Sequence, residues 1–228
     1  MARKASRPKG GRKPQAARSG NERERIIGAF MHLLAVDPIE SIELGQIAEA
    51  AAVSLSRLRQ EFDSKLAILA AQTKDIDRQV LEGVEEEADE DARNRLLDVL
   101  MRRLEAMQPH RKAVRSLMCS AICNPGLALA LNALTARSMR WMLSAAGIGT
   151  SGPKGALRAQ GLALIFAQVL RVWISDDDPS LDRTMAELDR ALTRGQSWSR
   201  LLDDLCALVP SPGRRARRSR GGEQRAAA

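Results

Sequence analysis

The stretch that most constrains the fold of this chain is residues 43–65, ELGQIAEAAAVSLSRLRQEFDSK. Its first half has apolar residues at i, i+3, i+4 and i+7, which is the spacing of one face of a helix. These residues are Leu44, Ile47, Ala48 and Ala51. A tight turn then leads to Ser54, which can cap a second helix by accepting a hydrogen bond from its first amides. The pattern therefore predicts two short helices joined by a tight turn, which is a helix-turn-helix.

The second predicted helix has an apolar inner face, formed by Leu58 and Phe62, and a polar outer face. Such a helix can enter a DNA major groove, where arginine can reach the edge of a guanine. We expect Arg57 to contact a base, and Arg59 and Lys65 to hold phosphate. The full set of expected DNA-contacting residues is Ser54, Leu55, Ser56, Arg57, Arg59, Gln60 and Lys65.

The same stretch resembles the DNA-binding domain of TetR-type bacterial transcription regulators. The resemblance begins in the preceding helix, residues 25–34. The matching residues of the helix pair are Ile47, Ala48, Glu49, Ala50, Ala51, Val53, Ser54, Leu58, Phe62, Ser64 and Lys65. The resemblance implies an all-α, TetR-like fold, with a three-helix DNA-binding domain before a larger helical domain. It also implies a repressor that a small apolar effector releases from a double-stranded DNA operator.

Three positions depart from the family pattern. The family usually has glycine where Ala52 stands, tyrosine where Arg59 stands, and a small hydroxyl residue where Glu43 begins the first helix of the pair. A glutamate there would face DNA phosphate with an unfavourable charge.

Length and composition favour two all-helical domains. A chain of 228 residues suits a small and a medium-sized domain. Aromatic residues make up only 3% of the chain and tyrosine is absent, whereas strong helix formers are abundant. We expect nine or ten helices, with a DNA-binding domain at residues 21–65 and a ligand-binding and dimerisation domain at residues 66–210. Asn21 and Glu24 would open the first helix as a capping box.

The net charge of +8 comes from the two ends of the chain. Residues 1–20 carry +7 and residues 211–228 carry +5, which leaves −4 for the middle. Both ends are rich in Gly, Pro, Ser and Ala, a composition typical of disorder. The N-terminal tail is either an arm that binds DNA or a solubilising segment, and both alternatives stay open. For the C-terminal tail the solubilising role is favoured.

Methionine and aromatic residues of the second domain could line an apolar effector pocket, since methionine adapts to varied shapes. The expected lining residues are Met101, Leu104, Met118, Met139, Met142, Phe166 and Trp173. The alternative is that they only fill a bundle core, which is the safer assumption for any single one of them. The resemblance favours the pocket, because TetR-type regulators keep an effector site in this domain.

Two helical regions near the C-terminus, residues 157–174 and 181–208, are expected to form a homodimer. Their apolar faces exceed what one bundle should bury, and we place Leu188 on the shared face. In TetR-like proteins the last two helices pack against the same helices of a second subunit. The dimer then presents two recognition helices to successive major grooves.

Local signals predict where these C-terminal helices begin and end. Asp178 before Pro179 is interpreted as a cap followed by proline at the first helical position. This interpretation is favoured over a metal site at residues 176–178. Gly195 is expected to separate a penultimate helix from the last one.

A second resemblance supports another class of protein. Residues 172–189 resemble the C-terminal part of the lipid-binding accessory proteins of ubiquinone biosynthesis. Those proteins share the TetR-like fold, have lost DNA binding, and bind membranes through an amphipathic terminal helix. We place the regulator first, because the helix-turn-helix spacing is intact and a basic arm precedes it.

An enzyme is the least supported class. The sequence has no nucleophile elbow, no glycine-rich phosphate loop and no HExxH motif. Cys119, Cys123 and Cys206 form no CxxC motif and are expected to be reduced, buried thiols of a cytoplasmic protein. No apolar run is long enough to span a bilayer. We therefore expect no catalytic residue, no cofactor, no metal and no membrane partner.

Overall fold

The computed structural model describes residues 15–83 and 91–208, with side chains placed for residues 21–83 and 91–195. All regular structure in these ranges is helical, which confirms the all-α prediction and the expected number of helices. The elements are α1 (Gln15–Leu34), α2 (Leu44–Ala50), α3 (Leu55–Glu61), α4 (Lys65–Glu82), α5 (Ala92–Met107), the 3₁₀ turn η1 (Gln108–His110), α6 (Arg111–Cys123), α7 (Pro125–Ala145), α8 (Gly152–Trp173) and α9 (Asp182–Leu208).

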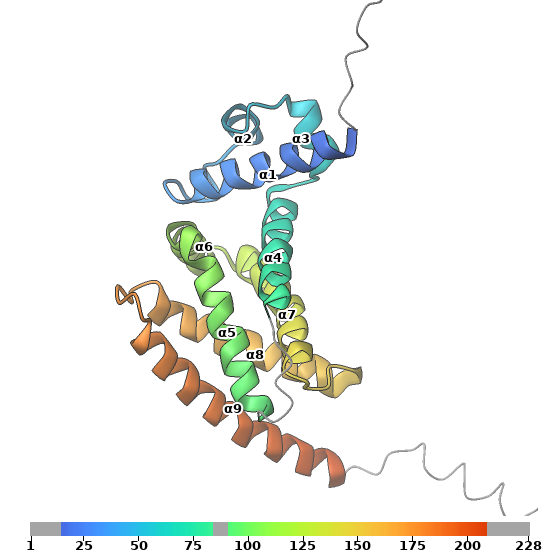
Figure 1. The fold of residues 1–228 in the computed structure, drawn as a ribbon, viewed down its shortest axis with the longest axis vertical. Helices are drawn as coiled ribbons and strands as arrows, with labels where there is room; N and C mark the ends of the chain where they lie inside the picture. The colour runs from blue at the N-terminus through green and yellow to red at the C-terminus, as the bar shows by residue number, and fades with distance from the viewer. Residues whose placement is uncertain (1–14, 84–90, 209–228) are drawn as a thin grey trace, which may run out of the picture.

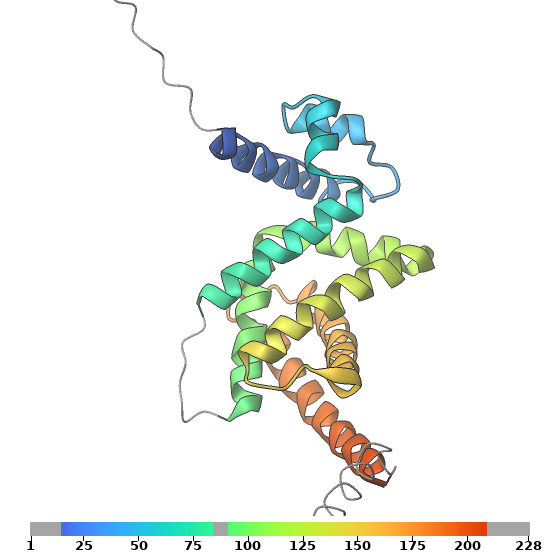
Figure 2. The same cartoon turned by 90° about the vertical axis from the view of Figure 1, so that its right-hand side faces the viewer.

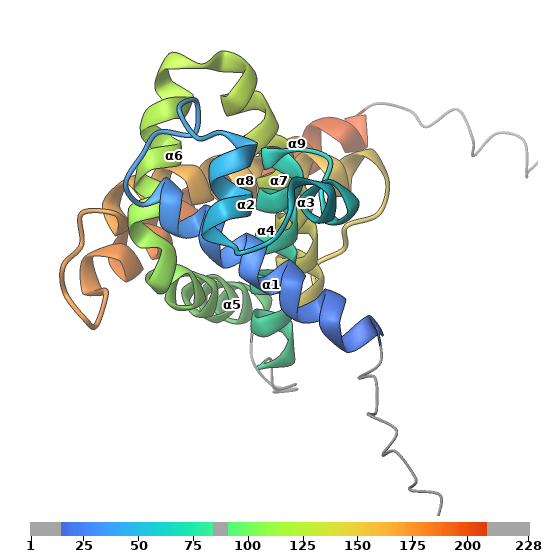
Figure 3. The ribbon, with the colours of Figure 1, turned by 90° about the horizontal axis from the view of Figure 1, so that it is seen from above.

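The helices form two units joined by α4. Figure 1 shows α1, α2 and α3 together at one end, and α4 running from them into the larger unit of α5 to α9. The view turned by 90° shows the same separation (Figure 2). Seen from above, α1 to α3 lie over the larger unit (Figure 3). No helix within the described ranges is long and apolar enough to cross a membrane.

The first unit has a core that its own three helices do not complete. Ile26, Phe30 and Ile47 are fully buried there, and Ile68 of α4 joins them. Ala113, Leu117 and Leu127 of α6 and α7 belong to the same cluster. The second unit therefore packs against the first, and α6 is the main helix through which α1 meets it.

The second core extends from the C-terminal half of α4 to α9. Its largest fully buried side chain is Trp173, and α8 packs against both α7 and α9. Leu188, which we expected on a dimer face, is fully buried in this core, so that prediction is wrong. The physical reason is that α9 needs an apolar side to cover α8 within the same chain.

Two predicted boundaries in the first unit are wrong. The first helix begins at Gln15, so Asn21 lies inside α1 and does not cap it, and residues 15–20 of the predicted disordered arm are helical. Ala16, Ala17 and Arg18 are strong helix formers, which favours extension of α1 toward the N-terminus. The remaining tail residues, 1–14 and 209–228, lie outside the described residues.

The start of α9 also differs from the prediction. Asp178 accepts hydrogen bonds from the backbone N–H and hydroxyl of Ser180, at 3.0 and 2.8 Å, and so closes a turn instead of capping a helix. Asp176 binds the first turn of α9 instead. Its carboxylate accepts hydrogen bonds from the backbone N–H and hydroxyl of Thr184, at 2.9 and 2.6 Å. The helix itself begins at Asp182, after Leu181.

Gly195 does not separate two helices, because α9 is continuous from Asp182 to Leu208. A Cβ atom at Gly195 would lie 2.7 Å from Cδ1 of Ile165 on α8. The glycine therefore permits close approach of α8 and α9, and packing outweighs its low helix propensity.

Candidate nucleic-acid interface

The helix pair α2–α3 is held by caps at both of its N-termini. Ser54 accepts a hydrogen bond from the backbone N–H of Arg57 at 3.3 Å, as its predicted capping role requires. The side chain of Gln46 accepts one from the backbone N–H of Glu43 at 2.8 Å. Such bonds satisfy amides that a helix start leaves unpaired, so they fix where each short helix begins.

The turn between the two helices contains a strained residue. Ala52 has a φ of +51°, in the left-handed region that glycine adopts easily and other residues adopt at a cost of about 1–2 kcal/mol. Glycine is what the TetR pattern usually has at this position. The departure therefore keeps the turn but makes it less stable.

The faces of α3 agree with the prediction. Leu58 and Phe62 are buried, and the outward residues Ser56, Arg59 and Gln60 are exposed, with Arg57 half-buried. The prediction that Leu44 belongs to the buried face is wrong, since 46% of this residue is exposed. It is the first residue of α2 and lies at the edge of the packed face, before the buried pair Ile47 and Ala48.

Arg57 is joined to α1 by an ion pair that the sequence did not reveal. Its Nε donates to the Glu22 carboxylate at 2.9 Å, and Nη2 donates to the same oxygen. Nη1 donates to Oε1 of Gln60 at 2.7 Å. Glu22 therefore holds the arginine from which we expected base recognition, and a base would have to compete with it.

The other two basic residues expected to contact DNA, Arg59 and Lys65, also have partners within the chain. Arg59 forms an exposed ion pair with Asp63, one helical turn away. The Lys65 Nζ donates to the backbone oxygens of Ile39 and Ile42, at 2.5 and 2.9 Å. Lys65 thus ties the start of α4 to the segment before α2. An ion pair as exposed as Arg59–Asp63 exchanges partners at little cost, whereas Lys65 holds the fold together.

The predicted effector residues lie mostly in the packed core. Leu104, Met139, Met142, Phe166 and Trp173 are buried in the second core, Met101 packs against it, and Met118 is half-buried on α6. None of these seven lines the three cavities that the structure describes. Their burial agrees with the alternative that they fill the bundle core.

A buried ion pair with a hydrogen-bonded serine lies among these apolar residues. Arg103 of α5 forms an ion pair with Asp77 of α4, and the hydroxyl of Ser138 on α7 donates to the same Asp77 oxygen at 2.6 Å. The guanidinium also lies over the Phe166 ring, 5.5 Å from its centroid. Burial lowers the pKa of Arg103, while the charge and hydrogen bond of Asp77 oppose that shift. Asp77 and Arg103 are 26 residues apart, so no local signal could have paired them.

Comparison with known structures identifies the fold. The TetR transcriptional regulator from Nitrosomonas europaea ATCC 19718 superimposes with a TM-score of 0.59 at 24% sequence identity, over 77% of this chain and 98% of that one. A TetR transcriptional regulator from Rhodococcus sp. RHA1 gives a TM-score of 0.54 at 18% identity, over 78% and 97% of the two chains. The chain therefore has a TetR-like fold, as its sequence implied.

Sequence comparison adds no closer relative. No known family profile matches the chain, and no curated protein matches its sequence significantly. At these identities the shared structure establishes the fold, and function must be argued from the residues.

Proposed function

We propose that this protein is a DNA-binding transcription regulator whose helix-turn-helix is α2–α3. The observation that carries the proposal is α3 itself, which is capped by Ser54, anchored by buried Leu58, and polar on its outward face. A short helix of this kind, placed on a three-helix unit, suits insertion into a major groove. The TetR-like fold supports the same conclusion.

We further propose that the protein is a repressor. It would act as a homodimer on a double-stranded DNA operator and be released from it by a small apolar effector. Its dimer face would be formed by the exposed sides of α8 and α9. Leu157 and Leu164, seven residues apart on α8, share one side of that helix, and Met185 of α9 is also exposed. An apolar stripe left uncovered within one chain is a candidate for burial by a second copy.

Selection of bound fragments from random duplex DNA tests the DNA-binding part. We expect the full chain to enrich a two-fold symmetric sequence, with half-sites about one helical turn apart or a multiple of it. Failure to enrich any sequence, together with equal weak binding to all duplexes, would contradict the proposal.

Light scattering tests the dimer. Leu164→Arg should yield monomers, since the side chain is 60% exposed in one subunit and a charge there need not disturb the fold. Ile122→Arg is the matched control, because Ile122 is 82% exposed but belongs to α6, which is not one of the two helices of the proposed face. A wild-type monomer, or equal effects of the two variants, would count against this face.

A lipid-binding accessory protein is the second candidate, and the pairing of Arg57, Arg59 and Lys65 within the chain favours it. Such a protein should retain a hydrophobic molecule through purification and bind liposomes. Mass spectrometry of extracted ligand and liposome flotation distinguish the two functions. A stoichiometric prenyl lipid, with no DNA affinity, would reverse their order.

A further inference from the structure

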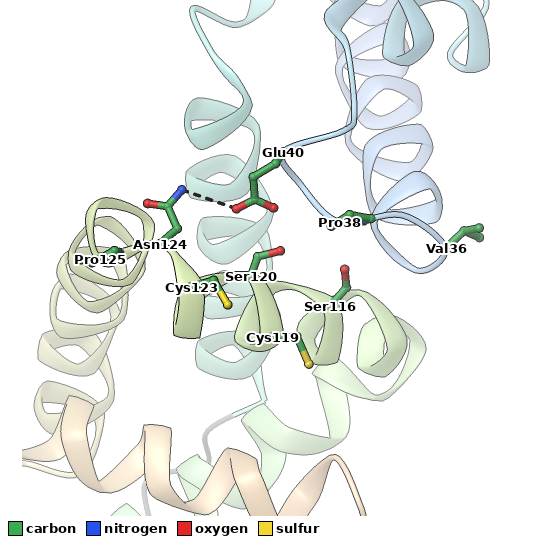
Figure 4. A pocket seen from close by; sticks show the side chains of 9 residues that line it. All are labelled: Val36, Pro38, Glu40, Ser116, Cys119, Ser120, Cys123, Asn124 and Pro125. Carbon is green, nitrogen blue, oxygen red and sulfur yellow. Dashed lines mark hydrogen bonds between the residues drawn. The ribbon is translucent and has the colours of Figure 1, made fainter.

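An open cavity of about 560 Å³ lies where the first unit meets the second. One wall is the segment between α1 and α2, with Val36, Pro38 and Glu40. The opposite wall is α6, which contributes Cys119 and Cys123 (Figure 4). The proposed regulator function does not use this cavity, and its cysteines are exposed, so the prediction that they are buried is wrong for these two.

The two cysteines form a pair by their spacing. They are four residues apart on one helix, which places their Cβ atoms about 5–6 Å apart on the same face. Figure 4 shows both sulfur atoms emerging on the same side of α6. Both thiols are free, and within the described residues neither has a disulfide partner.

This separation suits a bridging ion better than a disulfide. A disulfide needs Cβ atoms about 3.5–4.5 Å apart, so forming one here would distort α6. A metal ion between the two sulfur atoms spans the larger gap. Zinc normally requires four ligands, whereas the described residues contain no cluster of three or more His, Cys, Asp or Glu side chains able to hold a metal. Soft thiolates on their own favour copper(I).

We propose that Cys119 and Cys123 form a two-thiolate site for copper(I). Each thiol loses one proton to solvent as its sulfur binds the ion, and no electron is transferred. Two thiolates around one monovalent cation leave a complex with one net negative charge. That charge forms on α6, in the lining of the same cavity as the Glu40 carboxylate.

The position of the site gives it a route to the DNA-binding unit. The Ser116 hydroxyl of α6 donates to the backbone oxygen of Asp37 at 3.1 Å, and the Asn124 amide lies 3.5 Å from a Glu40 oxygen. Both contacts anchor the segment that leads into α2. The negative charge that copper adds to α6 would be unfavourable beside this segment, which carries the acidic residues Asp37 and Glu40, and would loosen the anchor. Copper is therefore expected to weaken DNA binding, a consequence that rests on the proposed regulator function.

Anaerobic titration of the reduced full chain with copper(I), against a chromogenic chelator, tests the site. We expect one tightly bound copper per chain, lost in Cys119→Ser and in Cys123→Ser. Cys206→Ser is the matched control and should keep the ion. A second control moves one thiol: Cys123→Ser with Ala121→Cys keeps the number of cysteines but separates them by two residues. It should not restore binding, because positions i and i+2 point to different sides of a helix.

Retention of copper by either single-site variant, or by the relocated pair, would overturn the site. Loss of copper from Cys206→Ser would overturn it as well. These measurements need no DNA, so they stand even if the protein is not a regulator.

Gel-shift titration of a selected DNA fragment, with and without one equivalent of copper(I), tests the coupling. Weaker DNA binding in wild type, with no change in Cys119→Ser, supports it. Unchanged DNA affinity with copper bound would overturn the coupling and leave the metal site. Absence of DNA binding in every state would overturn the regulator function instead, and the coupling with it.

Discussion

Two arginine–carboxylate pairs occupy opposite environments in this molecule. The pair of Arg57 with Glu22 joins α3 to α1, and its side chains are 38% and 25% exposed. The pair of Arg103 with Asp77 joins α5 to α4 in the second core, and its side chains are 5% and 11% exposed. The chemistry is the same in both. Only the surroundings differ, and they determine what each pair can do.

Solvent near Arg57 makes its present partner replaceable. Exposed ion pairs contribute about 0–1 kcal/mol, because water and salt compete with them. A DNA base or phosphate could therefore take the place of Glu22 at modest cost. Arg103 has no such freedom, since separating a buried pair leaves a charge without compensation. The first pair is suited to recognition and the second to fixing how α4, α5 and α7 pack.

The largest expected effect comes from removing one member of the buried pair. Asp77→Ala should lower the free energy of unfolding by about 3–5 kcal/mol, because Arg103 would stay buried without its carboxylate. Urea denaturation followed by circular dichroism measures the loss. Asp189→Ala is the matched control, since it breaks the more exposed pair of Asp189 with Arg93 and should cost much less. Equal losses in the two variants would show that burial does not distinguish the pairs.

Removing Arg57 should affect DNA recognition more than stability. Arg57→Ala should reduce discrimination between a selected site and a random duplex by about 1–3 kcal/mol. The salt dependence of binding should stay nearly unchanged. Arg59→Ala should instead weaken both duplexes alike and lower the slope of log affinity against log salt by about 0.9, as expected for one lost phosphate contact. Affinities measured at several salt concentrations test both variants, and identical behaviour of the two would contradict the separate roles.

A third comparison tests whether the backbone at Ala52 in the first unit is strained. Ala52→Gly should raise the free energy of unfolding by about 0.5–1 kcal/mol, because glycine adopts a positive φ without the steric cost. The same replacement at Ala50, the last residue of α2, relieves no positive φ and should lower it by less than about 1 kcal/mol. Thermal unfolding of both variants provides the measurement. Two changes of the same sign would rule out strain at Ala52.

The smallest effect is expected for Glu22→Gln, which weakens the half-buried pair of Glu22 with Arg57 and keeps the shape of the side chain. The free energy of unfolding should change by less than about 1 kcal/mol. DNA affinity should rise, because Arg57 loses its competing carboxylate and a negative charge leaves the interface. A large loss of stability would show that this pair, like the buried one, holds the fold.

Sequence alone determined the features that depend on neighbours along the chain. Ser54 caps α3 through a bond to Arg57, three residues away, and Leu58 lies on the buried face because helical spacing places it there. The all-α class follows from the same local preferences. These features depend on short-range hydrogen bonds and on the alternation of apolar and polar residues.

Only the tertiary structure decided which partners the charged side chains take. Glu22 lies 35 residues before Arg57, and Ser138 lies 61 residues after Asp77. Gly195 lies inside α9, where Ile165 of another helix approaches it too closely for a larger residue to fit without a shift. Cys119 and Cys123 line a cavity only because the segment after α1 folds back over α6. Each of these contacts forms when segments distant in the sequence pack together to bury apolar surface. The residues next to either partner in the sequence therefore do not predict the contact.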